Sequence, residues 1–171
     1  MRGILRVAFL ALLTLVIVGA FWSQNHAEHL ANKGAAETKF VTLVIDYGAK
    51  SGKPIQRFEV PDAPANASGW DLFKFAGVRA EGTEQYPTGF VCRLNDWPSA
   101  AAEDCKQTPA YAKGHWAYFV TNRSLGSGWI LSGQGAAAHI PDCGSFEGWS
   151  WIAGGANSTA PRFDTKIRGC K

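Results

Sequence analysis

The residues that could carry out chemistry are few in this sequence and lie far apart. It contains neither the G-x-S-x-G motif of α/β-hydrolases nor the H-E-x-x-H motif of zinc proteases. His115 and His139 are the histidines of the region after residue 38, and neither has an adjacent carboxylate or a cysteine at metal-ligand spacing. The sequence therefore predicts a protein that is not an enzyme and that holds no resident metal or cofactor.

Aromatic side chains form the main candidate binding surface. They come from segments that we expect to be adjacent strands, and they are Trp116, Tyr118, Trp129, Trp149 and Trp151. Exposed together, these rings would form a stacking platform for a planar ligand or a protein partner; buried, they would be the core of a small domain. Glu147 and Ser132 are the polar groups that could hydrogen-bond such a ligand. Trp97 and Tyr111, on loops, form a second candidate patch.

The elements that would position these residues begin with a hairpin and a helix. Residues 40–47 and 55–60 alternate between apolar and polar side chains around a Gly- and Pro-containing turn, which predicts two paired strands. Pro61 and Pro64 are expected to end the second strand. Residues 68–71 fit a capping box, which predicts a short helix over residues 70–76 with Gly77 at its end.

Four further segments read as strands. They are residues 90–95, 115–121, 129–132 and 147–152. The predicted order is therefore β-β-α-β-β-β-β. Strands in succession with one helix packed on their sheet indicate an α+β domain.

The N-terminus indicates the compartment. Arg2 and Arg6 precede an apolar run that extends from Val7 to Trp22, and this charge asymmetry predicts that the following domain lies outside the cytoplasm. Residues 1–22 are either a signal peptide, with cleavage after Ala20, or a retained single-pass anchor, and we favour the anchor. Residues 23–38 read as a polar linker, and residues 39–171 as the extracytoplasmic domain, which is either held at the cell membrane or secreted.

The four cysteines are expected to be oxidised in that compartment. Three connectivities are possible for Cys92, Cys105, Cys143 and Cys170. We favour the sequential one, because each pair then closes a local loop. A metal site is the alternative, but the cysteines lack the C-x-x-C spacing of zinc sites.

Charge and composition exclude other classes of protein. The chain carries 17 Lys and Arg against 14 Asp and Glu, a net charge of +3, which is too low for a protein that binds nucleic acid electrostatically. Apolar residues make up 46% of the chain and charged residues 18%, so a folded core is expected rather than disorder.

The region from residue 40 to residue 152 resembles a known family. It is similar to the domain of unknown function related to the C-terminal domain of transcobalamin, in the variant found in high-GC Gram-positive bacteria. The shared pattern is a Cys-Arg-apolar-Asn strand, a second cysteine, an aromatic strand, a Gly-x-Trp-x-x-Ser strand and a terminal Glu-Gly-Trp. The matching residues are Cys92, Arg93, Asn95, Cys105, Trp116, Tyr118, Gly128, Trp129, Ser132, Gly135, Pro141, Gly144, Glu147, Gly148 and Trp149.

The resemblance implies a β-grasp-like fold, a Cys92–Cys105 disulfide and a place in nutrient handling at the cell envelope. The best-understood relatives hold cobalamin between this domain and a helical barrel domain, and no helical repeats that would form such a barrel occur in this sequence. We therefore expect a non-catalytic envelope module that binds a corrinoid such as cobalamin, or another planar ligand. The alternative is an envelope protein–protein interaction module that uses the same aromatic face.

Overall fold

A computed structural model describes residues 37–121 and 128–166 of the chain. The elements are, in order, β1 (Thr38–Asp46), η1 (Ala49–Ser51), β2 (Gln56–Pro64), α2 (Leu72–Phe75), β3 (Ala80–Gly82), β4 (Val91–Leu94), η2 (Tyr111–Lys113), β5 (His115–Val120), β6 (Ile130–Leu131) and β7 (Phe146–Ile152). In these described ranges, no helix is both long and apolar enough to cross a membrane. The predicted signal peptide or anchor at residues 1–22, most of the predicted linker, and Cys170 lie outside the described residues.

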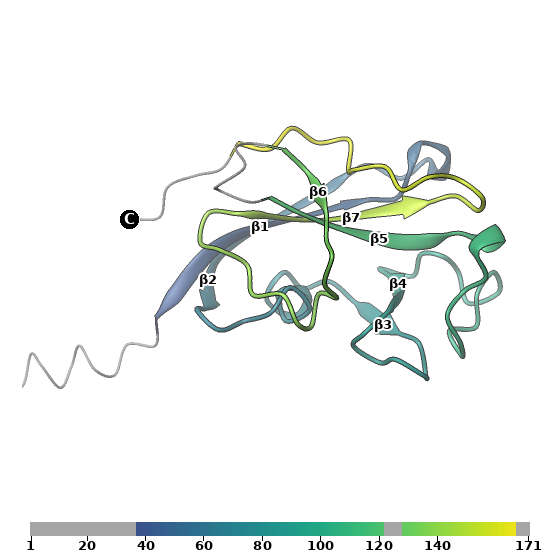
Figure 1. The fold of residues 1–171 in the computed structure, drawn as a ribbon, viewed down its shortest axis with the longest axis horizontal. Helices are drawn as coiled ribbons and strands as arrows, with labels where there is room; N and C mark the ends of the chain where they lie inside the picture. The colour runs from purple at the N-terminus through teal and green to yellow at the C-terminus, as the bar shows by residue number, and fades with distance from the viewer. Residues whose placement is uncertain (1–36, 122–127, 167–171) are drawn as a thin grey trace, which may run out of the picture. The chain divides into compact units, whose positions relative to one another are not determined.

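The centre of the domain is a mixed sheet of five strands in the order β2-β1-β7-β5-β6, and a second sheet pairs β3 with β4 (Figure 1). β1 and β7 are parallel, whereas the other neighbours in the large sheet are antiparallel. A mixed sheet with few helices makes this an α+β or mostly-β domain, which agrees with the predicted class in its coarse form. The sequence pattern does not predict β3, because three residues are too few to show alternation.

The predicted hairpin of β1 and β2 is confirmed, but the predicted end of β2 is wrong. The second strand does not stop at Pro61 but continues to Pro64, where it ends. Proline is tolerated because β2 is an edge strand, and the register shifts between Lys39 and Val41, as expected for a bulge.

Both faces of the large sheet are covered (Figure 1). One face, which includes Leu43 and Ile45 of β1, packs against α2 and the β3–β4 sheet. The opposite face, which includes Phe119 and Ile152, packs against Trp129 and the segment that follows β7. Each large apolar side chain that is fully buried in this way contributes about 1.5–3 kcal/mol to stability.

The capping box at residues 68–71 is confirmed. The backbone N–H of Ser68 donates to Asp71 Oδ2 at 2.9 Å, and the backbone N–H of Asp71 donates to Ser68 Oγ at 3.3 Å. The helix that follows, α2, is shorter than the predicted residues 70–76, and Gly77 after it has a φ of 66°, as a left-handed C-terminal residue does. The cap fixes α2 so that Phe73 reaches the sheet.

Candidate functional site

Three of the predicted platform residues are core residues instead. Trp116, Tyr118 and Trp149 expose only 4%, 8% and 4% of their surface. Tyr118 stacks on Trp149 with ring centroids 4.7 Å apart, and Gly69, just before α2, lies so close that a Cβ there would meet Tyr118 Oη. The expected open platform therefore does not form at these rings. Phe73 of α2 contacts Trp149, the turn before α2 covers Tyr118, and Trp97 and Tyr47 contact Trp116.

The other residues of the predicted binding surface lie in different parts of the domain. Trp129 lies on the opposite face of the sheet, where its Nε1–H donates to the carbonyl of Phe163 at 2.8 Å. Ser132 donates to the carbonyl of Gln134 in the loop after β6. Trp151, near the end of β7, is partly buried and borders open space. Of the predicted aromatic residues on strands, Trp151 is therefore the one that lines a cavity described below.

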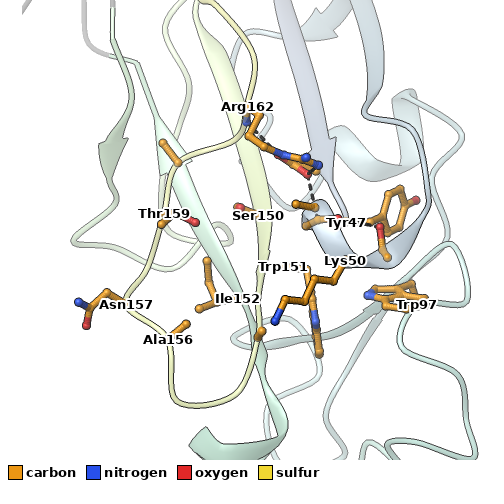
Figure 2. A pocket seen from close by; sticks show the side chains of 16 residues that line it. Tyr47, Lys50, Trp97, Ser150, Trp151, Ile152, Ala156, Asn157, Thr159 and Arg162 are labelled. Carbon is orange, nitrogen blue, oxygen red and sulfur yellow. Dashed lines mark hydrogen bonds and ion pairs between the residues drawn. The ribbon is translucent and has the colours of Figure 1, made fainter.

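A cavity of about 320 Å³ lies where the parallel strands β1 and β7 end. We call it the Trp151 cavity. The loop after β1, Trp97 and the segment from Ala156 to Arg162 form its walls, together with Trp151. Figure 2 shows Trp97 on one side of the cavity and Asn157 on the other, with the Lys50 side chain between them in this view. Its lining is mostly apolar with a few polar groups, which is typical of small-molecule sites.

A tight hairpin places Trp97 at this cavity. Leu94 and Trp97 exchange two backbone hydrogen bonds of 2.9 Å, with Asn95 and Asp96 between them. Both central residues have positive φ, 46° and 64°, as in a two-residue type I′ turn, and Asn and Asp tolerate that conformation. The Asn95 side chain then donates to Gln56 Oε1 at 3.0 Å, which ties the small sheet to the large one.

Glycines allow the backbone to approach Trp151 closely. Gly114 precedes β5 with a φ of 100°, and a Cβ there would lie 2.8 Å from the Trp151 ring. Gly48 follows β1, and a Cβ there would lie 3.1 Å from the Trp151 carbonyl oxygen. The Trp151 ring also contacts Trp116 at 71° and Trp97 at 83°. The indole is therefore fixed in place before any ligand arrives.

Asp46 and Arg162 hold the C-terminal wall of the Trp151 cavity. Arg162 donates to the Asp46 carboxylate from its backbone N–H, Nε and Nη2 at 2.8, 2.9 and 2.7 Å, and Gly48 N–H donates at 2.9 Å. Burial alone would raise the pKa of Asp46, but the hydrogen bonds from Arg162 and Gly48 outweigh it and lower that pKa. Asp46 is buried and its acceptor capacity is used, so it positions the segment that follows β7 rather than waiting for a ligand.

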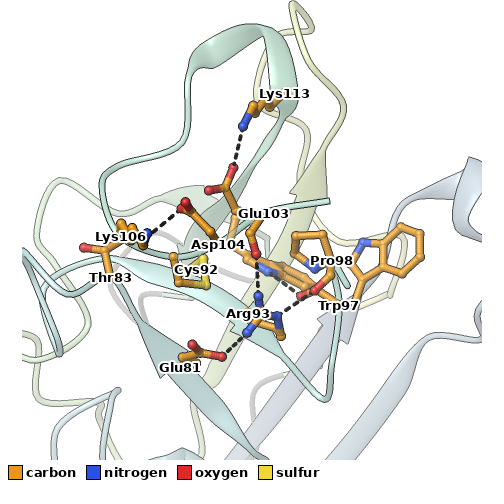
Figure 3. The surroundings of a disulfide bond; sticks show 12 residues. Glu81, Thr83, Cys92, Arg93, Trp97, Pro98, Glu103, Asp104, Lys106 and Lys113 are labelled. Carbon is orange, nitrogen blue, oxygen red and sulfur yellow. Dashed lines mark hydrogen bonds and ion pairs between the residues drawn. A yellow bond between two sulfur atoms is a disulfide. The ribbon is translucent and has the colours of Figure 1, made fainter. Parts of the chain in front are cut away.

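A disulfide between Cys92 and Cys105 closes the loop that carries Trp97, as the sequence predicts. Inside this loop Arg93 donates to the carbonyls of Pro98 and Glu103 at 2.7 and 2.6 Å (Figure 3). Cys143 is disulfide-bonded as well, and its predicted partner, Cys170, lies outside the described residues. A disulfide of this kind is typical of an extracellular or otherwise oxidising compartment.

No family model matches this sequence, and no curated protein matches it.

Glu147 lies in the core, apart from the Trp151 cavity. It is fully buried on β7 and accepts a hydrogen bond from the Tyr118 hydroxyl. His139 Nε2 lies 3.4 Å from Glu147 Oε1, which is an ion-pair distance, and Oε1 accepts no hydrogen bond from the described residues. No carboxylate adjoins His139 in the sequence, because the fold brings His139, from a loop, and Glu147, from β7, together from separate segments.

The pKa values in this buried cluster are shifted. Burial raises the pKa of Glu147, and the contact with Glu147 raises the pKa of His139. Burial also raises the pKa of Tyr118. Lys39 is buried nearby and donates to three carbonyls, those of Ala65, Ala67 and Pro141, at 2.8–3.0 Å, and burial lowers its pKa. Every member of the cluster has protein partners, so it serves as an internal polar support of the sheet.

In residues 37–121 and 128–166, no three His, Cys, Asp or Glu side chains are grouped as a metal site would require. The sequence pattern does not identify Asp46 and Arg162, which line the Trp151 cavity, or Glu103, which lies close to Trp97 and Trp151 beside that cavity. Asp46 carried a signal, since a charged residue late in an apolar strand must find a partner. Arg162 and Glu103 lie in irregular segments and carry no such signal.

Proposed function

We propose that the domain is a non-catalytic ligand-binding module at the cell envelope, with the ligand held in the Trp151 cavity. The observation that carries the proposal is the pair of indole rings, Trp97 and Trp151, which line one cavity of about 320 Å³. Indole faces bind flat apolar groups, and a volume near 300 Å³ is at the lower end for small-molecule sites. Trp97 Nε1 is buried without a hydrogen-bond partner among the described residues, so a polar atom of a ligand could accept from it.

The ion pair at the wall of the Trp151 cavity favours a binding role over catalysis. Asp46 and Arg162 neutralise each other at one wall, where their hydrogen bonds hold the segment after β7. A general acid or base must instead keep its proton site within reach of a substrate.

The location outside the cytoplasm is supported by the Cys92–Cys105 disulfide. The positively charged N-terminus and the apolar run after it agree with that location. We infer that the N-terminal segment delivers the domain to the outer side of the membrane and keeps it there.

The resemblance to the transcobalamin-related family suggests the class of ligand. The parallel pairing of the first and last strands, with the hairpin partner β2 beside them and α2 on one face, supports a β-grasp-like assignment. A corrinoid is a large planar macrocycle, so the Trp151 cavity would hold one edge of it, and a smaller planar molecule would fit inside. We therefore propose a planar ligand, with a corrinoid as the first candidate.

The test is a titration of the full-length protein with cobinamide and with cobalamin, followed by tryptophan fluorescence and by calorimetry. Saturable binding that Trp151→Ala weakens by about tenfold or more would support the proposal, a loss that corresponds to about 1.4 kcal/mol. Trp70→Ala is the matched control, since Trp70 packs beside α2 and lines neither the Trp151 cavity nor the cavity next to it. Equal loss in both variants would contradict the proposed site.

A protein–protein interaction module is the second candidate, and a different surface supports it. Ile130 and Leu131 of the edge strand β6 are both exposed, and an apolar strand edge can accept a strand from a partner. Light scattering over a range of protein concentrations tests self-association through this edge. Association that Leu131→Lys abolishes would favour this candidate, and a monomer at all concentrations would count against self-pairing.

A further inference from the structure

A second cavity adjoins the Trp151 cavity and differs from it in charge. It has a volume of about 290 Å³ and shares Trp97 and Trp151 with its neighbour. The wall of this second cavity also includes Glu103, Lys113 and Gly114. We name it the Glu103 cavity. It combines two indole rings with one buried carboxylate.

We infer that the Glu103 cavity is a subsite for a primary alkylammonium group. Aromatic faces attract cations, and a carboxylate accepts the N–H groups of an ammonium ion. The inference rests on the proposed binding function of the adjoining Trp151 cavity and names the charged group that the same ligand would carry.

The state of the Glu103 side chain is the main argument. The residue is 7% exposed, and its Oε2 is buried without a hydrogen-bond partner among the described residues. A buried carboxylate oxygen in that condition costs free energy unless a donor reaches it. Glu103 lines both the Glu103 cavity and a third cavity of about 330 Å³, so a donor could approach from either side.

The backbone that carries the Glu103 carboxylate is held in place by the protein itself. Arg93 donates to the Glu103 carbonyl at 2.6 Å, and Cys105, two residues later, is anchored by the disulfide (Figure 3). The backbone of Glu103 is therefore fixed within the closed loop. Such preorganisation lowers the entropic cost of binding.

The ammonium group of Lys113 already lies near the Glu103 carboxylate. Its Nζ lies 3.6 Å from Glu103 Oε2, which is close enough for an ion pair but too long for a hydrogen bond. The Lys113 side chain is 62% exposed although Glu103 is buried, so the Lys113 ammonium keeps contact with water while it pairs with the carboxylate. A ligand ammonium could therefore displace Lys113 and make the shorter, hydrogen-bonded contact. Because the oxygen lacks an N–H donor, a primary ammonium is favoured over a quaternary one.

The experiment compares n-butylammonium with two analogues on the full-length protein. One is n-butanol, which is neutral, and the other is tetramethylammonium, which has no N–H. The readout is the shift of the Trp97 and Trp151 indole N–H signals in NMR spectra during titration. We expect saturable binding of n-butylammonium, weaker binding of tetramethylammonium and none of n-butanol. Equal binding of n-butanol would overturn the inference.

Two substitutions sharpen the test. Glu103→Gln removes the charge at nearly constant shape and should weaken n-butylammonium binding by about tenfold, the loss of one charge-assisted hydrogen bond. Glu81→Gln is the control, because Glu81 is an exposed carboxylate that pairs with Arg93 from outside the cavity. Lys113→Ala should strengthen binding, since it removes the internal competitor, and this holds even if Glu103→Gln does not fold. Unchanged affinity in Lys113→Ala together with unchanged affinity in Glu103→Gln would overturn the inference.

The outcome is separable from that of the proposed function. If cobinamide binds both the wild type and Glu103→Gln while n-butylammonium binds neither, the ammonium subsite is overturned and the planar-ligand site stands. If n-butylammonium binds through Glu103 but no planar ligand binds, the subsite stands and the planar-ligand proposal falls.

Discussion

Trp97 and Trp151 meet edge to face, with ring centroids 6.4 Å apart and ring planes at 83°. Trp97 belongs to the hairpin after β4 in the small sheet, whereas Trp151 belongs to β7 at the centre of the large sheet. The two walls of the proposed site are therefore supplied by different sheets. Whatever fixes the small sheet on the large one also fixes the site.

Asn95 makes that connection, so Asn95→Asp should loosen it. The aspartate keeps the tolerance for positive φ but cannot donate to Gln56 Oε1 or Tyr47 Oη, as Asn95 does at 3.0 and 3.3 Å. We expect the free energy of unfolding to fall by about 1–2 kcal/mol in urea titrations. The Trp97 indole signal should also move.

Asp96→Asn is the control for Asn95→Asp. Asp96 has a positive φ as well, but its side chain is 72% exposed and pairs with Arg79 at the surface. An exposed pair contributes little, so the stability should change by less than about 0.5 kcal/mol. Equal destabilisation by both variants would refute the role of Asn95 as the link.

The Cys92–Cys105 disulfide should stabilise the domain through the loop it closes. Replacing both cysteines by alanine should lower the free energy of unfolding by about 3 kcal/mol, because a short loop is no longer constrained in the unfolded chain. Substitution is preferable to reduction, since reduction would also break the disulfide of Cys143. An unchanged unfolding midpoint in denaturant would contradict this expectation.

Asp46 should make the stability depend on acid pH. Its pKa lies below the ordinary 3.8, so the folded state holds the charged form more tightly than the unfolded state does. The resulting stabilisation is complete above pH 3.8 and is lost as the pH falls through the lowered pKa.

Asp46→Asn should therefore be less stable than the wild type near neutral pH, and the difference should shrink in acid. Thermal unfolding measured over a pH series checks this. Asp62→Asn, at an exposed position on β2, is the control and should change little. A stability difference for Asp46→Asn that stays constant into strong acid would contradict the assignment.

Glu147→Gln should lower the pKa of His139. The nearby carboxylate raises that pKa above the ordinary 6.5, so the His139–Glu147 contact stabilises the fold below pH 6.5 and is lost as the pH rises through the raised value. Histidine NMR signals followed against pH measure the change. His115, whose pKa burial lowers, serves as the internal reference. An unaltered His139 titration would show that Glu147 is not its partner.

The sequence predicted the elements with strong local signals. The hairpin of β1 and β2 and the capping box before α2 are confirmed, because alternation and caps act within a few residues. The continuation of β2 through Pro61 to Pro64 could not be predicted, since it depends on β2 lying at the edge of the sheet.

The site was harder to predict than the fold. The pattern identifies Trp149 and Trp151 as neighbours on one face, but not that Trp149 is buried while Trp151 borders a cavity. The difference in burial between Trp149 and Trp151 depends on which elements pack on this face of the sheet. Helix α2 packs over Trp149. Glu103 could not be predicted either, because its burial depends on the disulfide loop and on η2, which precede β5.

The most direct test of the account is a map of the indole N–H signals of the seven tryptophans while a planar ligand is added to the full-length protein. Cobinamide and benzimidazole, added separately, cover a large and a small planar ligand. We predict that at least one of them shifts the Trp97 and Trp151 signals together and saturably, with the Trp70 and Trp129 signals unchanged. Shifts at Trp70 or Trp129 alone, or no shift with either compound at millimolar concentration, would contradict a planar-ligand site at the Trp151 cavity.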